Sequence, residues 1–569
     1  MNKVNVKLLL SLFIPLLMGS CYNDMGGNDF DTVLPDVSIV IPAEAYSTGI
    51  GSQITIVPEI KTDIDTTDLK YYWEVRSDST NERGSKIFRS LVPDSQQGKI
   101  LHYTGKLDAN ISVLNNSYPC RLRVHQVSTG RDFYSASTFT ITLSGITGLM
   151  ILHGDNSGTE IGMLQDGDFT PAAMSIPATP VVVPDLYSSS NGSKLPGAPL
   201  SITQTVTNYI SAYGAYYPSL NERCGKILTL TSNGATWINK DGFERLGDWN
   251  TAFYAQGSEA VNQNKPKGIF AYQLYLYAFD GTDVFIQSPL QQKYFLFAEV
   301  TDSTVYADKN TYTFEPQFIT TTGGTYPIMM YANSVNGDKT HKGFFGLRTG
   351  NPGYMTRYGM ILDSKNDPAV FNPGNMHADI VKMAWDGRRH VMAVLKGDAA
   401  NVLYPDKFFA VDLNPSATPV TGSVTAYSGI GQYLYNLSAL PNIDNAVAFE
   451  FGTTSNMCYY AAGSKVYQYN CDAGNIGSPR ELGMTDGSSW DPKGTVTMMK
   501  MLDNSQNTPT HNTKEAILMV AAYQGSNAVL WALHMDTMTG RISKAVEYSA
   551  ATVPDWKFGP IKDIYIKAM

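Results

Sequence analysis

The sequence predicts an all-β protein, in which an N-terminal immunoglobulin-like β-sandwich is followed by an irregular β-propeller. Short runs rich in β-branched and aromatic residues recur along the chain, and several alternate apolar with polar side chains, as strands do. Tight-turn pairs that contain glycine separate many of these runs. Charged residues make up only 16% of the chain, which holds 49 glycines and 34 tyrosines. This balance suits a β-rich protein with many turns.

Residues 1–20 have the three parts of a secretory signal peptide. Two lysines precede an apolar run that ends at Met18, and the small residues Gly19 and Ser20 follow it. The run is far shorter than the roughly 18 residues expected of a membrane-spanning helix, and Pro15 interrupts it. We therefore expect that this segment directs export and is removed.

The residues around the cleavage site indicate a lipid anchor. Met18-Gly19-Ser20-Cys21 resembles the lipobox of bacterial lipoproteins, which implies that Cys21 becomes the mature N-terminus and carries the lipid. Each buried CH₂ contributes about 0.8 kcal/mol, so several acyl chains would hold the protein on a membrane permanently. A soluble periplasmic protein with a chance cysteine is the alternative.

Residues 21–34 are predicted to form a flexible tether, because residues 22–31 are polar and acidic and lack apolar periodicity. Acidic residues soon after the lipidated cysteine resemble the surface-export signal of Bacteroidota lipoproteins. The resemblance implies an outer-membrane protein that faces the cell exterior.

Length and charge narrow the class of protein. A chain of 569 residues is too long for one ordinary core and indicates two or more domains. The formal net charge is −9, and no basic run is present, so nucleic acid is an unfavourable partner. Beyond the signal peptide, we find no apolar stretch long enough to span a bilayer.

Residues 35–145 are predicted to form the sandwich. Val37–Pro42 is a short β-branched run that ends at proline. Alternation places Leu69, Tyr71, Trp73 and Val75 on one strand face. Six or seven such strands with one tryptophan on a middle strand fit an immunoglobulin-like fold, although the antibody-type disulfide is absent.

The sandwich and its junction resemble a known family. A YxWEV strand precedes RLRVHQVSTGRDFYSASTFTITL, and Ser144-Gly145 then leads into GLMILHGDNSGTEIGML. These segments are similar to the PKD-like family of Bacteroidota outer-membrane lipoproteins. The resemblance implies a setting beside SusC/SusD-type TonB-dependent nutrient importers, and it supplies no activity by itself.

Residues 146–569 carry the pattern of propeller blades, in which a strand, a tight turn and a second strand repeat. At roughly 40–55 residues per blade, this length gives about seven or eight blades. A set of stacked sandwiches is the alternative. The turn signals that carry the prediction are Asn233-Gly234, Asp280-Gly281, Asp386-Gly387, Gly463-Ser464 and Thr539-Gly540.

Two of the cysteines are close in sequence. If Gly463-Ser464 is the turn of its hairpin, Cys458 faces Tyr469, and Cys471 is the diagonal neighbour of Cys458 on the same sheet face. A disulfide between Cys458 and Cys471 and a pair of buried free thiols are about equally compatible with this pattern.

No motif identifies an enzyme, a cofactor site or a metal site. The chain contains no H-E-x-x-H, G-x-S-x-G, Walker A or G-x-G-x-x-G sequence. His377, Asp379 and His390 could be metal ligands, but two histidines and a carboxylate occur easily by chance in a chain of this length. We therefore assign no catalytic residue, no cofactor and no metal.

Aromatic residues give the best indication of a binding surface. Tyrosine offers a flat apolar face and a polar tip, which suits sugars, peptides and protein partners alike. A buried aromatic plug is the alternative. The candidate residues lie in two segments and are Tyr209, Tyr213, Tyr216, Tyr217, Tyr354, Arg357 and Tyr358.

Together these features predict a non-enzymatic, surface-exposed lipoprotein that is accessory to a SusC/SusD-like importer. Its propeller would bind a glycan or peptide ligand or dock on the importer, since lipid anchoring raises local concentration on one membrane. One alternative is a surface hydrolase of glycans or peptides that uses carboxylates in the propeller funnel. The other is a purely structural importer subunit.

Overall fold

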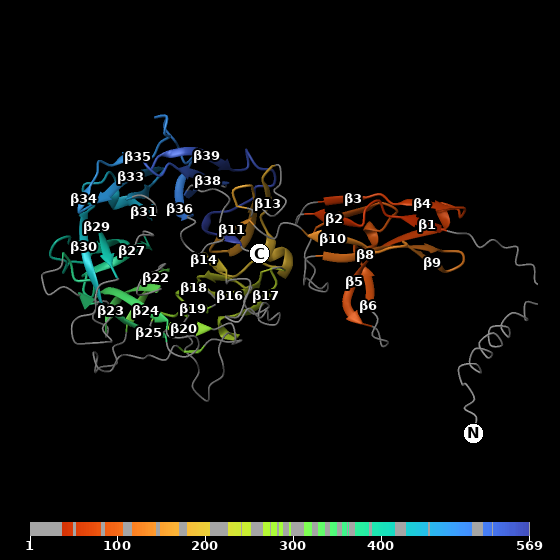
Figure 1. Cartoon of the computed structure of the whole chain (residues 1–569), viewed down its shortest axis with the longest axis horizontal. Coiled ribbons are helices and arrows are strands. Elements are labelled where there is room, and N and C mark those ends of the chain that lie inside the picture. The colour runs from red at the N-terminus through yellow and green to blue at the C-terminus, as the bar shows by residue number, and fades with distance from the viewer. Residues whose placement is uncertain are drawn as a thin grey trace, which may run out of the picture. The chain divides into compact units, whose positions relative to one another are not determined.

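The chain is all-β and divides into two compact units, one within residues 1–142 and the other formed mainly by residues 143–569 (Figure 1). The predicted all-β class is confirmed. The computed structural model describes residues 37–48, 53–80, 86–105, 117–143, 148–169, 179–204, 226–240, 242–251, 266–272, 275–281, 284–287, 295–296, 312–320, 328–335, 342–349, 356–360, 362–363, 370–385, 390–415, 428–452, 456–502, 516–525 and 527–567.

The described residues of the first unit form ten strands, where the sequence predicts six or seven. Five of them pair in the order β2-β10-β8-β5-β6, with β9 added on β8, while β1 pairs with β4 and β3 with β7. Two 3₁₀ turns, η1 (Thr66–Asp68) and η2 (Asp94–Gln96), connect strands. The strands are β1 (Val37–Val40), β2 (Ala45–Thr48), β3 (Gln53–Ile56), β4 (Glu59–Thr62), β5 (Leu69–Thr80), β6 (Lys86–Ser90), β7 (Leu101–Thr104), β8 (Ser117–Gln126), β9 (Arg131–Tyr134) and β10 (Phe139–Leu143).

Trp73 lies at the centre of this unit. Its side chain is fully buried, its indole N–H donates to the Gly98 carbonyl at 2.8 Å, and its ring meets Phe139 edge-on at 5.9 Å. Leu69 and Val75 are buried on the same face and Tyr71 is half-buried, so the predicted facing of β5 is confirmed.

The opposite face of β5 is less exposed than simple alternation predicts. Glu74 is buried because both of its carboxylate oxygens are taken, one by Arg121 at 2.8 Å and the other by Arg123 at 2.7 Å. These arginines alternate along β8 with the buried residues Cys120, Leu122 and Val124, as the sequence predicts. The ion pairs cover a sheet face that would otherwise be open.

Among the described residues, the second unit contains seven predominantly antiparallel sheets that follow one another in chain order (Figure 1). Most consist of four strands, each hydrogen-bonded to the strand before it. The strands of the first four sheets are β11 (Gly148–Asp155), β12 (Gly158–Gln165) and β13 (Val181–Val183); β14 (Pro199–Gln204), β15 (Lys226–Thr231), β16 (Gly234–Asn239) and β17 (Arg245–Asp248); β18 (Gly268–Tyr272), β19 (Tyr275–Phe279), β20 (Val284–Gln287) and β21 (Phe295–Leu296); and β22 (Tyr312–Thr320), β23 (Ile328–Val335), β24 (Gly343–Thr349) and β25 (Thr356–Met360).

The last three sheets carry two small additions: β26 pairs in parallel with β30, and β35 pairs with β33. Two further 3₁₀ turns are η3 (Trp249–Thr251) and η4 (Ile443–Asn445). The strands are β26 (Leu362–Asp363), β27 (Ala378–Trp385), β28 (Val391–Gly397), β29 (Phe408–Asn414) and β30 (Ser428–Asn436); β31 (Ala446–Phe451), β32 (Met457–Ala462), β33 (Lys465–Asp472), β34 (Asn475–Ile476) and β35 (Arg480–Glu481); and β36 (Thr495–Leu502), β37 (Ile517–Gln524), β38 (Asn527–Met535) and β39 (Ile542–Tyr548).

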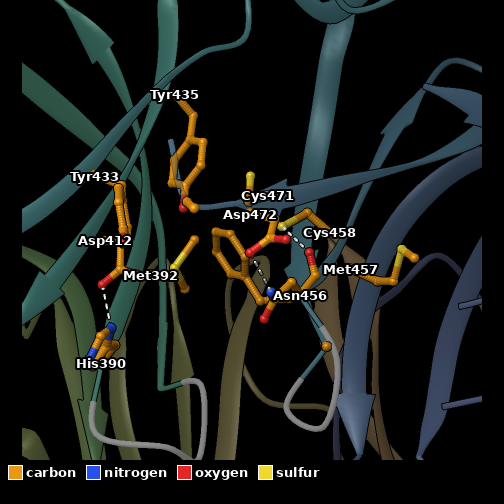
Figure 2. A pocket seen from close by; sticks show the side chains of 13 residues that line it. His390, Met392, Asp412, Tyr433, Tyr435, Asn456, Met457, Cys458, Cys471 and Asp472 are labelled. Carbon is orange, nitrogen blue, oxygen red and sulfur yellow. Dashed lines mark hydrogen bonds and ion pairs between the residues drawn. The ribbon is translucent and has the colours of Figure 1, made fainter. Parts of the chain in front are cut away.

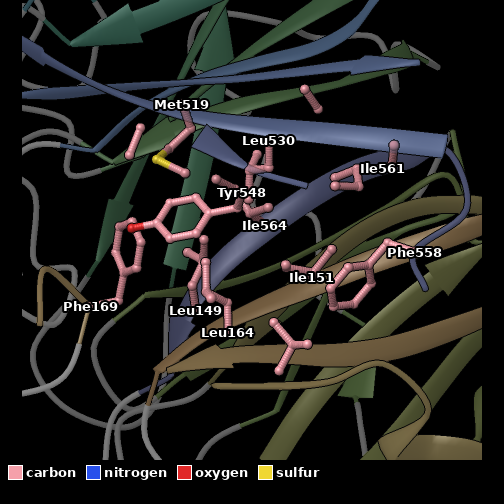
Figure 3. Close-up of a cluster of buried hydrophobic side chains, with 14 of the residues drawn as sticks. Leu149, Ile151, Leu164, Phe169, Met519, Leu530, Tyr548, Phe558, Ile561 and Ile564 are labelled. Atoms are coloured by element: carbon pink, nitrogen blue, oxygen red, sulfur yellow. The ribbon is translucent and has the colours of Figure 1, made fainter. Parts of the chain in front are cut away.

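The C-terminal strand β40 (Ile561–Lys567) returns to the first sheet, where it pairs with β11 and places Tyr565 opposite Met150. One apolar cluster consequently combines the first sheet with the seventh. Figure 3 shows Leu149, Leu164 and Ile564 of the first sheet around Tyr548 of β39.

Neighbouring sheets share apolar cores. The initial strands of successive sheets also contact one another; for example, β18 of the third sheet contacts β22 of the fourth. The C-terminal strand β40 contacts both β14 of the second sheet and β36 of the seventh. Examples of core pairs from successive sheets are Met150 with Ile202, Leu228 with Ala278, Tyr331 with Trp385, Ala410 with Tyr460, and Ala461 with Leu518.

The predicted turns connect paired strands. Thr231 lies opposite Gly234 and Ala462 lies opposite Lys465, so the hairpins at Asn233-Gly234 and Gly463-Ser464 are confirmed. Gly463 has a φ of 63°, which glycine adopts without a steric penalty. The strands around the other three signals are also antiparallel partners, although Asp386-Gly387 itself lies outside the described residues.

One short helix, α2 (Leu186–Asn191), was not predicted from the sequence. The carboxylate of Glu160, on β12, is buried and accepts hydrogen bonds from the backbone amides of Tyr187 and Ser188 at 2.9 and 3.1 Å. These amides belong to the first helical turn and would otherwise lack partners. The cap that holds this helix therefore comes from a residue more than twenty positions earlier in the chain.

Candidate functional site

A pocket of about 290 Å³ opens between the fifth and sixth sheets of the second unit. Figure 2 shows His390, Asp412, Tyr433 and Tyr435 on one side of it and the residues of β32 and β33 on the other. Because both walls are rigid sheets, the pocket is held by paired backbone and not by loops alone.

The wall from the fifth sheet is a row of cross-strand neighbours. Met392 on β28 lies opposite Asp412 on β29, which lies opposite Tyr433 on β30. Tyr435 is two residues further along β30 and therefore projects from the same face. Its ring centre is 6.3 Å from that of Tyr433, and it is buried whereas Tyr433 is half-buried.

The wall from the sixth sheet is a second row. Phe451 on β31 lies opposite Cys458 on β32, which lies opposite Tyr469 on β33. Cys471 projects from the same face two residues beyond Tyr469, and all four side chains belong to the apolar cluster shared with the fifth sheet. The pocket is where this shared core opens toward solvent.

Two polar pairs stand at the pocket. The Nδ1 atom of His390 lies 2.7 Å from Oδ1 of Asp412, an ion pair when the imidazole is protonated, and 29% of the His390 side chain remains exposed. On the other wall, the Asn456 amide donates to a carboxylate oxygen of Asp472 at 3.4 Å. Each carboxylate therefore already has a protein partner.

The two thiols in the pocket wall are free and buried. The Cys458 thiol donates to the Asn456 carbonyl, with the sulfur 3.9 Å from the oxygen, and the same carbonyl accepts the backbone amide of Cys471 at 3.0 Å. A hydrogen bond with the Cys458 thiol, together with burial, raises the pKa of Cys471. Burial also raises the pKa of Tyr435, so its hydroxyl stays protonated near neutral pH.

These groups suit the binding of a neutral polar ligand. Tyrosine rings offer a flat apolar surface, and the imidazole, amide and carboxylate groups supply donors and acceptors. Within the described part of the chain, no cluster of three or more histidine, cysteine or acidic side chains is arranged to hold a metal ion.

The residues considered as metal ligands are engaged elsewhere. Asp379 pairs with Lys342 at 2.6 Å, and the His377 ring lies 3.2 Å from the side-chain nitrogen of Asn375. His390 is the one residue of that trio that lines the pocket, and it does so with Asp412.

The aromatic residues predicted to bind ligand are not part of this site as described. Arg357 and Tyr358 lie on β25, opposite Arg348 and Leu347, and their side chains are outside the description. The lipidation residue Cys21 and the other candidates fall outside the described residues; these candidates are Tyr209, Tyr213, Tyr216, Tyr217 and Tyr354.

Most of the pocket residues were missed by sequence reasoning. One available signal was Asp412, a lone carboxylate in the otherwise apolar strand FFAVDLN. This strand packs against the sheet face that carries the cysteines. That packing depends on contacts between sheets, which no local sequence pattern predicts.

The fold defines an all-β protein with an N-terminal domain and a second unit of many antiparallel sheets. The sequence profile described as the PKD-like family matches residues 21–199. Those residues therefore carry a PKD-like family domain, which includes β1–β10 of the first unit and β11–β13 of the second.

Comparison with other proteins adds two solved structures. The extracellular domain of a one-component system from B. thetaiotaomicron is similar at a TM-score of 0.32 and 11% identity, over 92% of this chain and 68% of that one. Hsv2p of Kluyveromyces lactis is similar at a TM-score of 0.28 and 7% identity, over 76% of this chain and 95% of that one. No curated protein sequence matches the chain. Among the described residues, no helix is both long and apolar enough to cross a membrane.

Proposed function

We propose that this protein is a lipid-anchored surface protein that binds a small neutral ligand without transforming it. The anchor is Cys21, and residues 21–34 are the tether that lets the folded units face outward. Support for the anchor comes from the signal peptide and the lipobox-like residues that end at Cys21. In the chain, the first unit would then follow the tether and precede the binding unit.

We further propose that the seven sheets of the second unit are the blades of a β-propeller. Three observations support this arrangement: most of the sheets are four-stranded meanders, neighbouring sheets share cores, and β40 completes the first sheet. Pairing of the first and last segments in one sheet would close such a ring, because the first blade would take strands from both ends of the unit.

The pocket between the fifth and sixth sheets carries the proposal of binding. Asp412 and Asp472 are each already partnered, so a cationic ligand would have to compete with His390 and Asn456. Hydroxyl groups can add to these pairs without breaking them, while the C–H face of a sugar ring packs on Tyr433. A neutral glycan unit therefore fits better than a peptide side chain bearing a positive charge.

We propose that the bound ligand is the nutrient of a SusC/SusD-like importer in the same membrane. A protein fixed in the same membrane as a transporter reaches a high effective concentration near it, so weak affinity for the ligand or the importer is sufficient. Co-purification of the lipidated protein with such a pair would support this part of the proposal.

The hydrolase alternative is weakened at two acidic positions. Glu450 on β31 forms an ion pair with Lys382, and Asp563 on β40 forms one with Lys500. Each of these carboxylates is already engaged by a lysine ammonium, which would have to be displaced before the carboxylate could act on a substrate.

Calorimetric titration of the mature chain carrying Cys21→Ser tests the binding proposal, with neutral hexose and pentose oligosaccharides set against tripeptides. We expect an oligosaccharide to bind and Tyr433→Ala to weaken it at least tenfold, or about 1.4 kcal/mol. Tyr134→Ala, at a 45% exposed tyrosine of the first unit, is the matched control and should bind as the parent does. Equal affinity of the two variants, or binding of charged tripeptides alone, would contradict the assignment.

A further inference from the structure

The pocket wall contains two thiols placed as neighbours. Cys458 lies opposite Tyr469, and Cys471 is the diagonal neighbour of Cys458 on the same face. Both side chains line the pocket while remaining 2% and 5% exposed.

This placement sets the order of reactivity. A buried thiol with a raised pKa is a slow nucleophile toward an external disulfide, because the thiolate is the attacking species. Once one of the two sulfurs carries a mixed disulfide, the other is already beside it. The second step is therefore intramolecular and faster than a second attack from solution.

We propose that Cys458 and Cys471 are a redox pair that closes to a disulfide in the pocket wall, and that closure weakens ligand binding at this site. The first part stands on the geometry alone, and the second rests on the proposed function. With oxidised glutathione as oxidant, one thiolate attacks its disulfide and releases one glutathione. The second protein thiolate then attacks the mixed disulfide and releases another. Two protein S–H bonds become one S–S bond, and the two protons are carried by the two reduced glutathione molecules.

The link to binding passes through Asn456. Its carbonyl accepts from the Cys458 thiol and from the Cys471 amide, while its side chain holds Asp472 at the pocket. Disulfide formation removes the thiol donor and draws the two sulfurs together. Both groups that donate to the Asn456 carbonyl are thereby displaced. We therefore expect the Asn456–Asp472 pair to lose its position.

Peptide mapping of the folded mature chain tests the disulfide. The protein is incubated with oxidised glutathione, alkylated and digested with trypsin without reduction. Cleavage at Lys465 separates the two cysteines, so the disulfide joins peptide 408–465 to peptide 466–480. Cys120, whose cross-strand partners are Val75 and Phe139, is the internal control and should remain a thiol. Unmodified thiols or stable glutathione adducts at both pocket cysteines would overturn the pairing.

Titration of the reduced and oxidised forms with the oligosaccharide bound by the reduced protein tests the coupling. We expect oxidation to weaken binding about fivefold, equivalent to about 1 kcal/mol. Cys471→Ser should bind equally before and after oxidant treatment. A cross-linked peptide with unchanged affinity would refute the coupling alone. If the reduced protein binds no oligosaccharide, the proposed function fails and with it the coupling, while the disulfide is still decided by the peptide map.

Discussion

The Nζ atom of Lys500 on β36 lies 2.7 Å from the Oδ1 atom of Asp563 on β40. The second oxygen of the same carboxylate accepts the backbone amide of Ile202, on β14, at 2.9 Å. A single side chain of the C-terminal strand thus connects the seventh sheet, the first sheet and the second. The C-terminal strand is therefore held by side-chain contacts to β14, a strand that lies far earlier in the sequence.

Replacement of Asp563 by alanine should therefore destabilise the second unit. The change leaves the Lys500 ammonium and the Ile202 amide without their shared acceptor, and we expect a loss of about 2 kcal/mol in the free energy of unfolding. Denaturant unfolding monitored by hydrogen exchange in β40 measures it.

A matched control is Glu481→Ala, which removes an ion pair with Lys465 whose side chains are both more than half exposed. Exposed pairs contribute little, so this variant should stay within about 0.5 kcal/mol of the parent. If Asp563→Ala behaves the same way, the carboxylate does not hold the strands together.

Trp73 offers a test of the first unit. Its ring is fully buried against Phe139, so Trp73→Ala should destabilise the unit by about 3–5 kcal/mol through lost burial and a residual cavity. Exchange of the β5 amides measures this unit separately from the other. Val127→Ala, at a 49% exposed position, is the control. A loss below about 1 kcal/mol for Trp73→Ala would contradict the packing described for β5.

The lipid anchor is tested at Cys21. Cys21→Ala should abolish labelling by radioactive fatty acid and release the protein from the membrane fraction, because no other residue is proposed to carry acyl chains. Cys120→Ala, which alters a cysteine buried in the first unit, should leave labelling unchanged. Labelled Cys21→Ala protein would refute the assignment.

Local sequence patterns correctly predicted the hairpin registers and strand facings that depend only on residues close in the sequence. The turn at Gly463-Ser464 was enough to place Cys458 opposite Tyr469, because a two-residue loop determines the register of its hairpin. Alternation along β8 likewise separated Leu122 from Arg123.

The pocket could not be predicted in this way. It exists because the row that contains Asp412 faces the row that contains Cys458, and that facing depends on which sheets pack together. Helix α2 was missed for a related reason, since its cap is the distant Glu160. Burial of Glu74 likewise depends on two arginines of another strand.

His153 should make the second unit sensitive to acid. Its Nδ1 atom accepts the Gly559 amide at 3.1 Å and its Nε2 atom lies 2.9 Å from the Pro184 carbonyl, so the ring is neutral with its proton on Nε2. Burial lowers the pKa of His153 to about 4 from an ordinary value of 6.5.

The unfolded chain therefore binds a proton at His153 more readily than the folded chain does. The stability due to the neutral ring is complete above about pH 6.5 and is lost as the pH falls toward 4, by up to about 3 kcal/mol. Unfolding free energies of the parent and of His153→Gln, measured for the second unit, should converge over this range. A constant difference between the parent and His153→Gln would show that this ring does not resist protonation in the folded protein.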